Sequence, residues 1–128
     1  MIDAAVLYAP LHADAWQNFL RWRDRTNRDS KTRDALGSRE ENPAAWDAIS
    51  AASRLTEIDA PVLVFHGTAD KDVPYDWSRD LASRLETAGK DAEFVTYAGE
   101  GHEFGPQWDD FMRKTAEFFR LHLDPSVH

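Results

Sequence analysis

Three short apolar runs divide the chain, and stretches with hydrophobic residues at helical spacing lie between them. The runs are too short for helices and end near turn-forming residues, so each is predicted to be a β-strand. The predicted strands are Ile2–Tyr8, Val62–Phe65 and Glu93–Tyr97. The predicted helices are Asp14–Trp22, Pro43–Ala52, Pro74–Ala88 and Pro106–Leu123, and the polar stretch Thr26–Glu41 is predicted to be a loop or a short helix.

The order of these elements, β-α-α-β-α-β-α, predicts an α/β fold. Strands that alternate with helices form a parallel sheet with right-handed crossovers, and helices cover it. The sequence has 128 residues, enough for a sizeable core, and we find no internal repeat, linker or low-complexity tract. We therefore expect a single domain over residues 1–128.

Composition and charge narrow the possible partners. The formal net charge is −8, which argues against nucleic acid, and the basic cluster Arg21–Arg33 is interleaved with aspartates. No apolar run approaches the roughly 20 residues that span a bilayer. Cysteine is absent and the first residues lack the basic flank of a signal peptide. We expect a cytoplasmic protein that binds neither nucleic acid nor membrane.

Candidate chemistry follows the second and third predicted strands. The segment His66–Asp70, with Val73-Pro74 after it, follows the second strand, and Gly99–Phe104 follows the third. A carboxylate and an imidazole in successive loops at the carboxyl ends of parallel strands are typical of the last two members of a Ser…Asp…His triad.

Asp70 and His102 are the predicted pair. Asp70 alone could simply cap its own loop, and Asp72 could do either task. Gly67 permits a sharp turn out of the strand, which favours a functional acid. We expect an Asp70 oxygen to lie roughly 2.6–3.2 Å from His102 Nδ1 and to accept its proton. His66, at the end of a buried strand, is interpreted as structural.

No nucleophile is evident. The sequence contains no Gly-x-Ser-x-Gly elbow, and none of its seven serines lies in a strand–turn–helix context. The serines are Ser30, Ser38, Ser50, Ser53, Ser78, Ser83 and Ser126, of which Ser78 and Ser83 are expected to face solvent. His12, His122 and His128 show no supporting pattern, and no pair of histidines has metal-ligand spacing, so no metal and no cofactor are expected.

Three of these segments resemble the C-terminal half of an α/β-hydrolase catalytic domain of the prolyl oligopeptidase type. The resemblance covers about Ile2 to Leu123, roughly half of a usual family domain. It implies that Asp70 is the catalytic acid and His102 the catalytic base. The segments that carry it are Ala4–Pro10, Ile58–Asp70 and Tyr97–Phe104.

The resemblance implies hydrolysis of a peptide or ester bond through an acyl-enzyme, with the nucleophile and the oxyanion donors on segments that this sequence lacks. An isolated monomer is therefore expected to be inactive, whether the chain is a short natural protein, a truncation or half of a split enzyme. A degenerate, non-catalytic binding or oligomerisation module is one alternative, and a small hydrolase with a newly assembled site is another. We expect Ile2–Tyr8, an unprotected edge, to pair with a second copy or with a complementary N-terminal half.

Overall fold

The computed structural model describes residues 1–23 and 29–127, and part of the Arg21–Arg33 cluster lies outside them. The chain forms two compact units. The sheet unit comprises Met1–Leu11 and Ile58–His128, and the helical unit comprises His12–Glu57. The expectation of a single domain stays a prediction. No helix within the described part of the chain is both long and apolar enough to cross a bilayer.

The sheet unit contains three parallel strands in the order β1-β2-β3, which confirms the predicted α/β class. The strands are β1 (Ala5–Tyr8), β2 (Val62–Gly67) and β3 (Ala92–Tyr97). The first strand begins three residues later than predicted. The Ala5 N–H makes a 3.0 Å hydrogen bond to Pro61 O at the start of the ladder, whereas Met1 and Ile2 are exposed.

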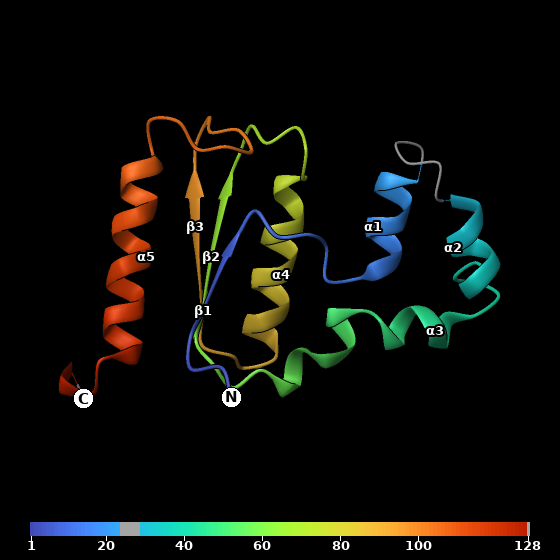
Figure 1. Cartoon of the computed structure of the whole chain (residues 1–128), viewed down its shortest axis with the longest axis horizontal. Helices are drawn as coiled ribbons and strands as arrows, with labels where there is room; N and C mark the ends of the chain where they lie inside the picture. The colour runs from blue at the N-terminus through green and yellow to red at the C-terminus, as the bar shows by residue number, and fades with distance from the viewer. Residues whose placement is uncertain (24–28, 128) are drawn as a thin grey trace. The chain divides into compact units, whose positions relative to one another are not determined.

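Two helices cover opposite faces of this sheet (Figure 1). Helix α4 (Tyr75–Thr87) connects β2 to β3, and helix α5 (Trp108–Leu123) follows β3, with a short 3₁₀ turn, η2 (Pro125–Val127), after it. Pro74 precedes the first turn of α4, and Gly89 follows its end with a φ of 69°, as the sequence predicts for a helix C-terminus.

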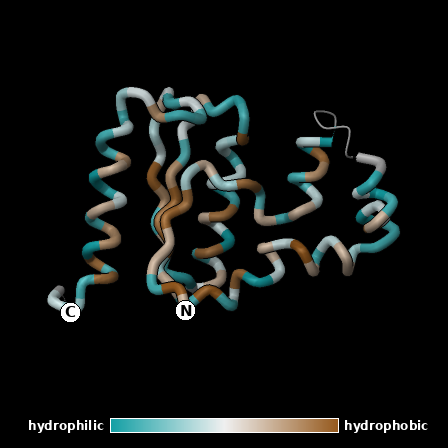
Figure 2. The backbone as a smooth tube through the Cα atoms, in the orientation of Figure 1, coloured by the Kyte–Doolittle hydropathy of each residue, from teal (hydrophilic) through white to brown (hydrophobic). Residues whose placement is uncertain are grey.

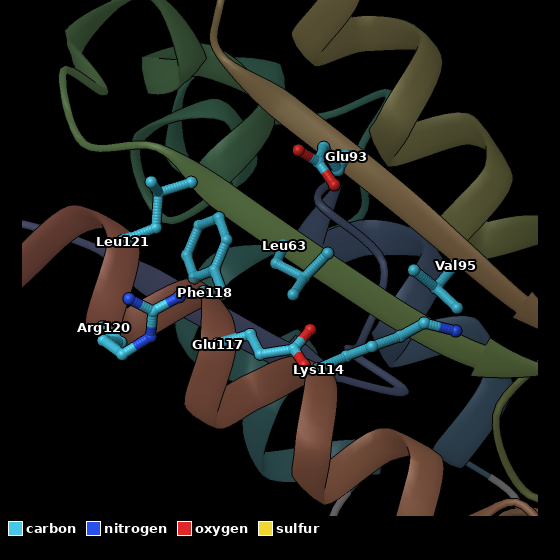
Figure 3. Close-up of a pocket in the computed structure, with 8 residues that line it drawn as sticks. All are labelled: Leu63, Glu93, Val95, Lys114, Glu117, Phe118, Arg120 and Leu121. Carbon is cyan, nitrogen blue, oxygen red and sulfur yellow. The ribbon is translucent and has the colours of Figure 1, made fainter. Parts of the chain in front are cut away.

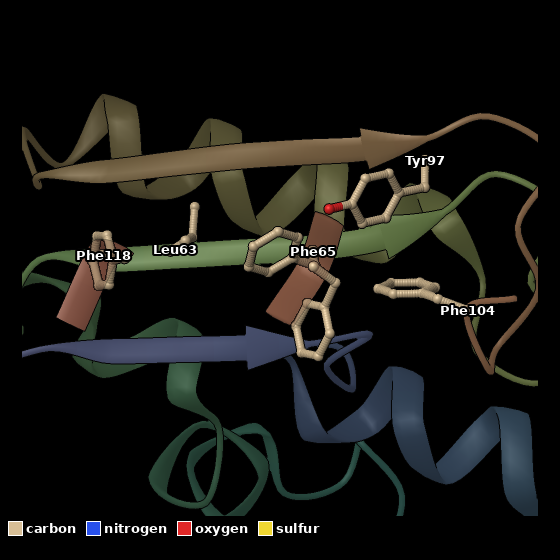
Figure 4. Close-up of a cluster of buried hydrophobic side chains, with 6 residues drawn as sticks. Leu63, Phe65, Tyr97, Phe104 and Phe118 are labelled. Carbon is tan, nitrogen blue, oxygen red and sulfur yellow. The ribbon is translucent and has the colours of Figure 1, made fainter. Parts of the chain in front are cut away.

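The core lies on both faces of β2. Side chains alternate between the two faces of a strand, so Leu63 and Phe65 point toward α5 while Val64 and His66 point the other way, toward the face covered by α4. Figure 4 shows the first group packing with aromatic side chains from the loop after β3 and from α5. The strands are the most hydrophobic part of the sheet unit in Figure 2. Burial on both faces explains why β2 is a continuous apolar run.

The helical unit packs around Trp46, which is almost fully buried and makes an edge-to-face contact with Trp16 at 4.8 Å. Its helices are α1 (Ala15–Trp22), α2 (Asp29–Leu36), α3 (Pro43–Ala48) and the 3₁₀ helix η1 (Ala51–Glu57). Helix α3 ends four residues earlier than predicted. The Ser50 hydroxyl donates to the Trp46 carbonyl and the Ser50 N–H turns to Asp47 O, so the α-helical pattern stops there.

Candidate active site

The acid loop and the histidine loop leave neighbouring strands at the same edge of the sheet. Gly67 at the end of β2 is in register with Tyr97 at the end of β3. Asp70 lies three residues beyond the first strand end, and His102 lies five residues beyond the second. Because parallel strands end at one edge, the two loops meet above the sheet.

Asp70 and His102 form a hydrogen-bonded pair. His102 Nδ1 lies 2.9 Å from Asp70 Oδ2, within the distance predicted from the sequence. The Asp70 side chain is fully buried, whereas 38% of the His102 side chain is exposed. The other carboxylate oxygen, Oδ1, accepts hydrogen bonds of 2.9 Å from the backbone N–H groups of Asp72 and Val73. Asp70 thus caps its own loop with one oxygen and contacts His102 with the other.

These contacts determine the ionisation of Asp70. Burial raises the pKa of the Asp70 carboxyl, but the hydrogen bonds from His102, Val73 and Asp72 outweigh it, and the net pKa lies below the ordinary value. The carboxylate is therefore ionised at neutral pH and accepts the Nδ1 proton. That tautomer leaves the lone pair of His102 Nε2 free to accept a proton from a nucleophile.

Backbone hydrogen bonds join the two loops directly. The N–H of Ala69 donates to Glu100 O at 2.9 Å, and the N–H of Gly99 donates to Thr68 Oγ1 at 2.8 Å. The close approach requires a glycine at position 67, because a Cβ there would lie 2.2 Å from Glu100 O. The relative position of acid and base is thus determined by backbone atoms as well as by their own hydrogen bond.

Tyr8, at the end of β1, forms hydrogen bonds with the backbone of the histidine loop. Its hydroxyl donates to the backbone carbonyl of His102 and accepts a 3.2 Å hydrogen bond from the Phe104 N–H. Burial raises the pKa of the Tyr8 phenol, which therefore stays protonated at neutral pH. Within the same loop the buried Glu100 carboxylate accepts a hydrogen bond from Gly105 N–H. Sequence reasoning missed Tyr8; its position at the carboxyl end of a parallel strand was the available signal.

His66 lies beneath the acid loop with its side chain fully buried. Its Nδ1 atom is 2.6 Å from Ser78 Oγ, and its Nε2 atom is 3.0 Å from Val73 O and 3.0 Å from Asp70 Oδ2. The expectation that Ser78 faces solvent is therefore wrong, because the inner face of α4 carries this hydroxyl onto β2. Ser83 is exposed, as expected.

An open, largely apolar recess of about 570 Å³ adjoins His102. It is lined by Tyr8, His102, Glu103, Phe104, Trp108 and Phe111. In residues 1–23 and 29–127, no side chain forms a hydrogen bond with His102 Nε2. The Nε2 atom therefore keeps its acceptor capacity within the described part of the chain.

Two other features resemble binding sites, a cluster of possible cation ligands and a second groove, but neither adds a group to the Asp70–His102 pair. Ligand atoms of Asp70, Asp72 and His102 lie within 4.8 Å of one another and could hold a cation, although Asp70 already accepts hydrogen bonds at both oxygens. A second groove, of about 370 Å³, lies between the sheet and α5 (Figure 3). Its charged side chains are two acids and two bases, Glu93, Glu117, Lys114 and Arg120, so it favours neither anions nor cations.

Comparison with known proteins identifies the family of the chain. The family model described as the prolyl oligopeptidase family matches residues 13–126, nearly the whole chain. The chain belongs to the prolyl oligopeptidase family. Members of this family are hydrolases that act as peptidases or esterases. The resemblance stated from the sequence motifs is thereby confirmed.

Curated relatives match over shorter segments. The chain is 34% identical over 56 residues to acyl-protein thioesterase 1 homolog 1 of Dictyostelium discoideum, which covers 44% of this chain and 25% of the relative. It is 38% identical over 42 residues to isoprenylcysteine alpha-carbonyl methylesterase of Arabidopsis thaliana, which covers 33% of this chain and 10% of the relative. The chain thus spans at most a quarter of the length of these relatives.

Solved structures show the same fold. A truncated form of a carbohydrate esterase from gut microbiota superposes with a TM-score of 0.58 at 29% identity, covering 64% of this chain and 29% of the esterase. The acylaminoacyl peptidase of Pyrococcus horikoshii superposes with a TM-score of 0.55 at 20% identity, covering 63% of this chain and 14% of that one. The chain therefore shares the fold of part of these hydrolases.

Proposed function

We propose that the chain carries the acid and the base of a serine hydrolase site, Asp70 and His102, and that a segment outside this sequence supplies the nucleophile. The observation that carries the proposal is the 2.9 Å hydrogen bond between His102 Nδ1 and a buried, ionised carboxylate. The absence of a Gly-x-Ser-x-Gly elbow from the sequence supports a serine on another segment.

The proposed reaction is acyl transfer to water. His102 Nε2 takes the proton of the incoming serine hydroxyl while the serine oxygen bonds to the substrate carbonyl carbon. Asp70 stabilises the imidazolium, which then gives its proton to the leaving amine or alcohol as the acyl bond breaks. Water, deprotonated by the same nitrogen, then attacks the acyl carbon, and the imidazolium returns the proton to the serine oxygen as the acyl–serine bond breaks. The substrate is a peptide or an ester, and the named relatives, a thioesterase and a methylesterase, support the ester class.

The edge of β1 is the proposed attachment point for the missing partner. Ala5 and Ala9 donate their N–H groups to Pro61 O and Phe65 O, on the β2 side. The alternating backbone groups of Val6 and Tyr8 therefore face the opposite side. Within the described residues no strand pairs with that edge. We propose that it pairs with the strand of a complementary N-terminal half, or antiparallel with a second copy to give a continuous six-stranded sheet.

A fluorophosphonate probe tests the catalytic proposal, because it labels a serine only when a base and an oxyanion site are assembled around it. The chain alone is expected to stay unlabelled, and the chain mixed with an N-terminal hydrolase half is expected to be labelled on that half. His102→Gln should abolish this labelling, and Ser83→Ala, an exposed change, should not. Labelling that survives His102→Gln would contradict the proposed base.

Two alternatives give different results in the same experiment. A degenerate module, favoured by the absence of any described hydroxyl at His102 Nε2, would show no labelling with any partner half. A hydrolase that assembles a new site between copies would be labelled without a partner, and the labelled serine would be one of its own seven.

Light scattering coupled to size exclusion tests the edge. We expect an assembly larger than the 14.6 kDa monomer at micromolar concentration. Val6→Lys, within β1, should dissociate it because a lysine on an edge strand opposes pairing. Val6 also packs against the core, so the result counts only where circular dichroism shows that the variant is still folded. Leu11→Lys, an exposed change outside the strand, is the matched control and should leave it intact. A folded, monodisperse 14.6 kDa wild type would refute self-pairing.

A further inference from the structure

We propose that His66 and Ser78 are positioning residues for the catalytic acid, with His66 held in its Nε2–H tautomer so that its N–H faces the Asp70 carboxylate. The proposal rests on the proposed role of Asp70 and His102. It assigns a task to a buried histidine and a buried serine that the acyl-transfer steps do not use.

The surroundings of the His66 ring determine where its proton lies. The Nε2 atom is 3.0 Å from the Val73 carbonyl oxygen and 3.0 Å from Asp70 Oδ2. Both oxygens only accept hydrogen bonds, since Asp70 is ionised. A lone pair on Nε2 would face two acceptors in a site without solvent, so Nε2 must carry a hydrogen. The hydrogen bond is made to Val73 O, and the Asp70 charge lies beside the same N–H.

Ser78 accounts for the other ring nitrogen. With the proton on Nε2, Nδ1 is an acceptor, and the Ser78 hydroxyl at 2.6 Å is a donor within reach. Ser78 comes from the first half of α4 and is fully buried. The ring is also in edge-to-face contact with Tyr75 at 5.9 Å. Helix α4 therefore holds the ring in place, and the Ser78 hydroxyl matches the tautomer that Val73 O and Asp70 Oδ2 require.

The result is a carboxylate that is surrounded on every side. The Oδ1 atom accepts from two backbone N–H groups, and Oδ2 lies between His66 Nε2 and His102 Nδ1. A carboxylate held in this way cannot rotate away when His102 becomes an imidazolium. The same His66 N–H binds the carbonyl of Val73, whose N–H donates to Asp70. His66 thus stabilises both the acid and the loop that bears it.

The first test is the tautomer in the isolated, isotope-labelled chain. Long-range ¹H–¹⁵N spectra distinguish Nδ1–H from Nε2–H imidazoles. We expect His66 to be the Nε2–H form and His102 the Nδ1–H form. An Nδ1–H tautomer at His66 would overturn the proposal, whether or not the chain has any activity.

The second test uses a pair of amide substitutions at one position. The Nε2 atom of glutamine occupies about the place of histidine Nε2, so His66→Gln keeps a donor toward Val73 and Asp70. The amide of His66→Asn reaches only the place of Nδ1. We expect fluorophosphonate labelling of the reconstituted enzyme to be near wild type for the first variant. For His66→Asn we expect labelling to be about 10- to 100-fold slower. Losses of this size are usual at metal sites when a residue that hydrogen-bonds to a metal ligand is removed.

Controls separate positioning from folding. Ser78→Ala should weaken the tautomer preference of His66, while Ser83→Ala on the exposed face of α4 should not. Denaturation midpoints identify any variant that fails to fold. If a variant does not fold, the tautomer of His66 in the wild-type chain alone tests the proposal. Equal labelling rates in folded His66→Gln and His66→Asn variants would refute the positioning role. A correct tautomer without any labelling would contradict the proposed function instead.

Discussion

Substitution of Gly67 by alanine tests whether the acid and histidine loops need their close backbone contact. A Cβ at position 67 would lie 2.2 Å from Glu100 O, 2.7 Å from Glu100 C and 2.8 Å from Gly101 O. Ordinary contacts begin at 3.4 Å, so the neighbouring chain would have to retreat by about 1.2 Å. All three atoms belong to the backbone, and no flexible side chain can absorb the movement.

The cost can be built from two contributions. Forcing an extra methyl group into a packed site costs roughly 1–3 kcal/mol. Retreat of the Glu100 carbonyl also stretches its 2.9 Å hydrogen bond from Ala69 N–H, whose net contribution is about 1 kcal/mol. We therefore expect Gly67→Ala to lower the free energy of unfolding by about 2–4 kcal/mol. Glu100 is two residues from His102, so the His102–Asp70 distance should lengthen as well.

Urea denaturation measures the first effect, and the Nδ1–H signal of His102 in NMR spectra measures the second. Gly101→Ala is the matched control, because a Cβ there meets no atom within 4 Å and its φ is not in the left-handed region. The control should raise the free energy of unfolding by no more than about 1 kcal/mol, because alanine lowers the conformational entropy of the unfolded chain. If the two variants unfold at the same urea concentration and keep the same His102 signal, the close approach does not determine the site.

Two further substitutions test the hydrogen bonds around the pair. Tyr8→Phe keeps the ring but removes the hydroxyl that binds His102 O and Phe104 N–H, so the free energy of unfolding should fall by about 1–2 kcal/mol. Tyr75→Phe removes only an exposed hydrogen bond to Thr96 Oγ1 and should cost under about 0.5 kcal/mol, so equal losses would argue against a special role for the Tyr8 hydroxyl. The pKa of Asp70 is lower in the folded chain than in the unfolded one, so its stabilisation is present above the unfolded pKa of about 3.9 and is lost as the pH falls through the folded pKa. Asp70→Asn should therefore flatten the acid limb of the stability–pH curve, and an unchanged limb would contradict the lowered pKa.

Much of the fold could be predicted because local patterns and tertiary packing agree. The apolar run of β2 is buried on both faces, and Pro74 and Gly89 mark the ends of α4 as predicted. The predicted and observed ends of an element differ where a hydrogen-bond partner distant in sequence determines where the element begins or ends. The strand β1 starts at Ala5 because Pro61 O, more than fifty residues later, is its first acceptor. Helix α3 ends where the Ser50 hydroxyl donates a hydrogen bond to the Trp46 carbonyl. The same hydroxyl oxygen accepts a hydrogen bond from Ala15 N–H.

The residues of the candidate site also fall into a predicted and an unpredicted group. Asp70 and His102 were predictable because each follows a recognisable strand and glycine-containing turn, and their separation of 2.9 Å follows from adjacent strand ends. Ser78 and Tyr8 were not predicted as parts of the site. Which face of α4 meets the sheet depends on the packing of Leu81 and Leu85, and a serine beside them gives no hydropathy signal of burial. The role of Tyr8 depends on a loop 94 residues away.

All groups that hold the acid and the base belong to the sheet unit. The hydrogen-bond donors to Asp70 come from its own loop and from His102, and His66 Nε2 lies 3.0 Å from Asp70 Oδ2. The histidine loop is bound by Tyr8 and by the acid loop. None of these contacts involves a segment that would carry a nucleophile. The hydrogen-bonded pair is therefore complete within the sheet unit, and the His102 side chain that carries Nε2 is 38% exposed. Preorganisation of this kind removes reorganisation of the acid–base pair from the cost of assembly. In the assembly that we propose, activity would depend on how well pairing at the β1 edge aligns the serine of the partner with a base that is already in place.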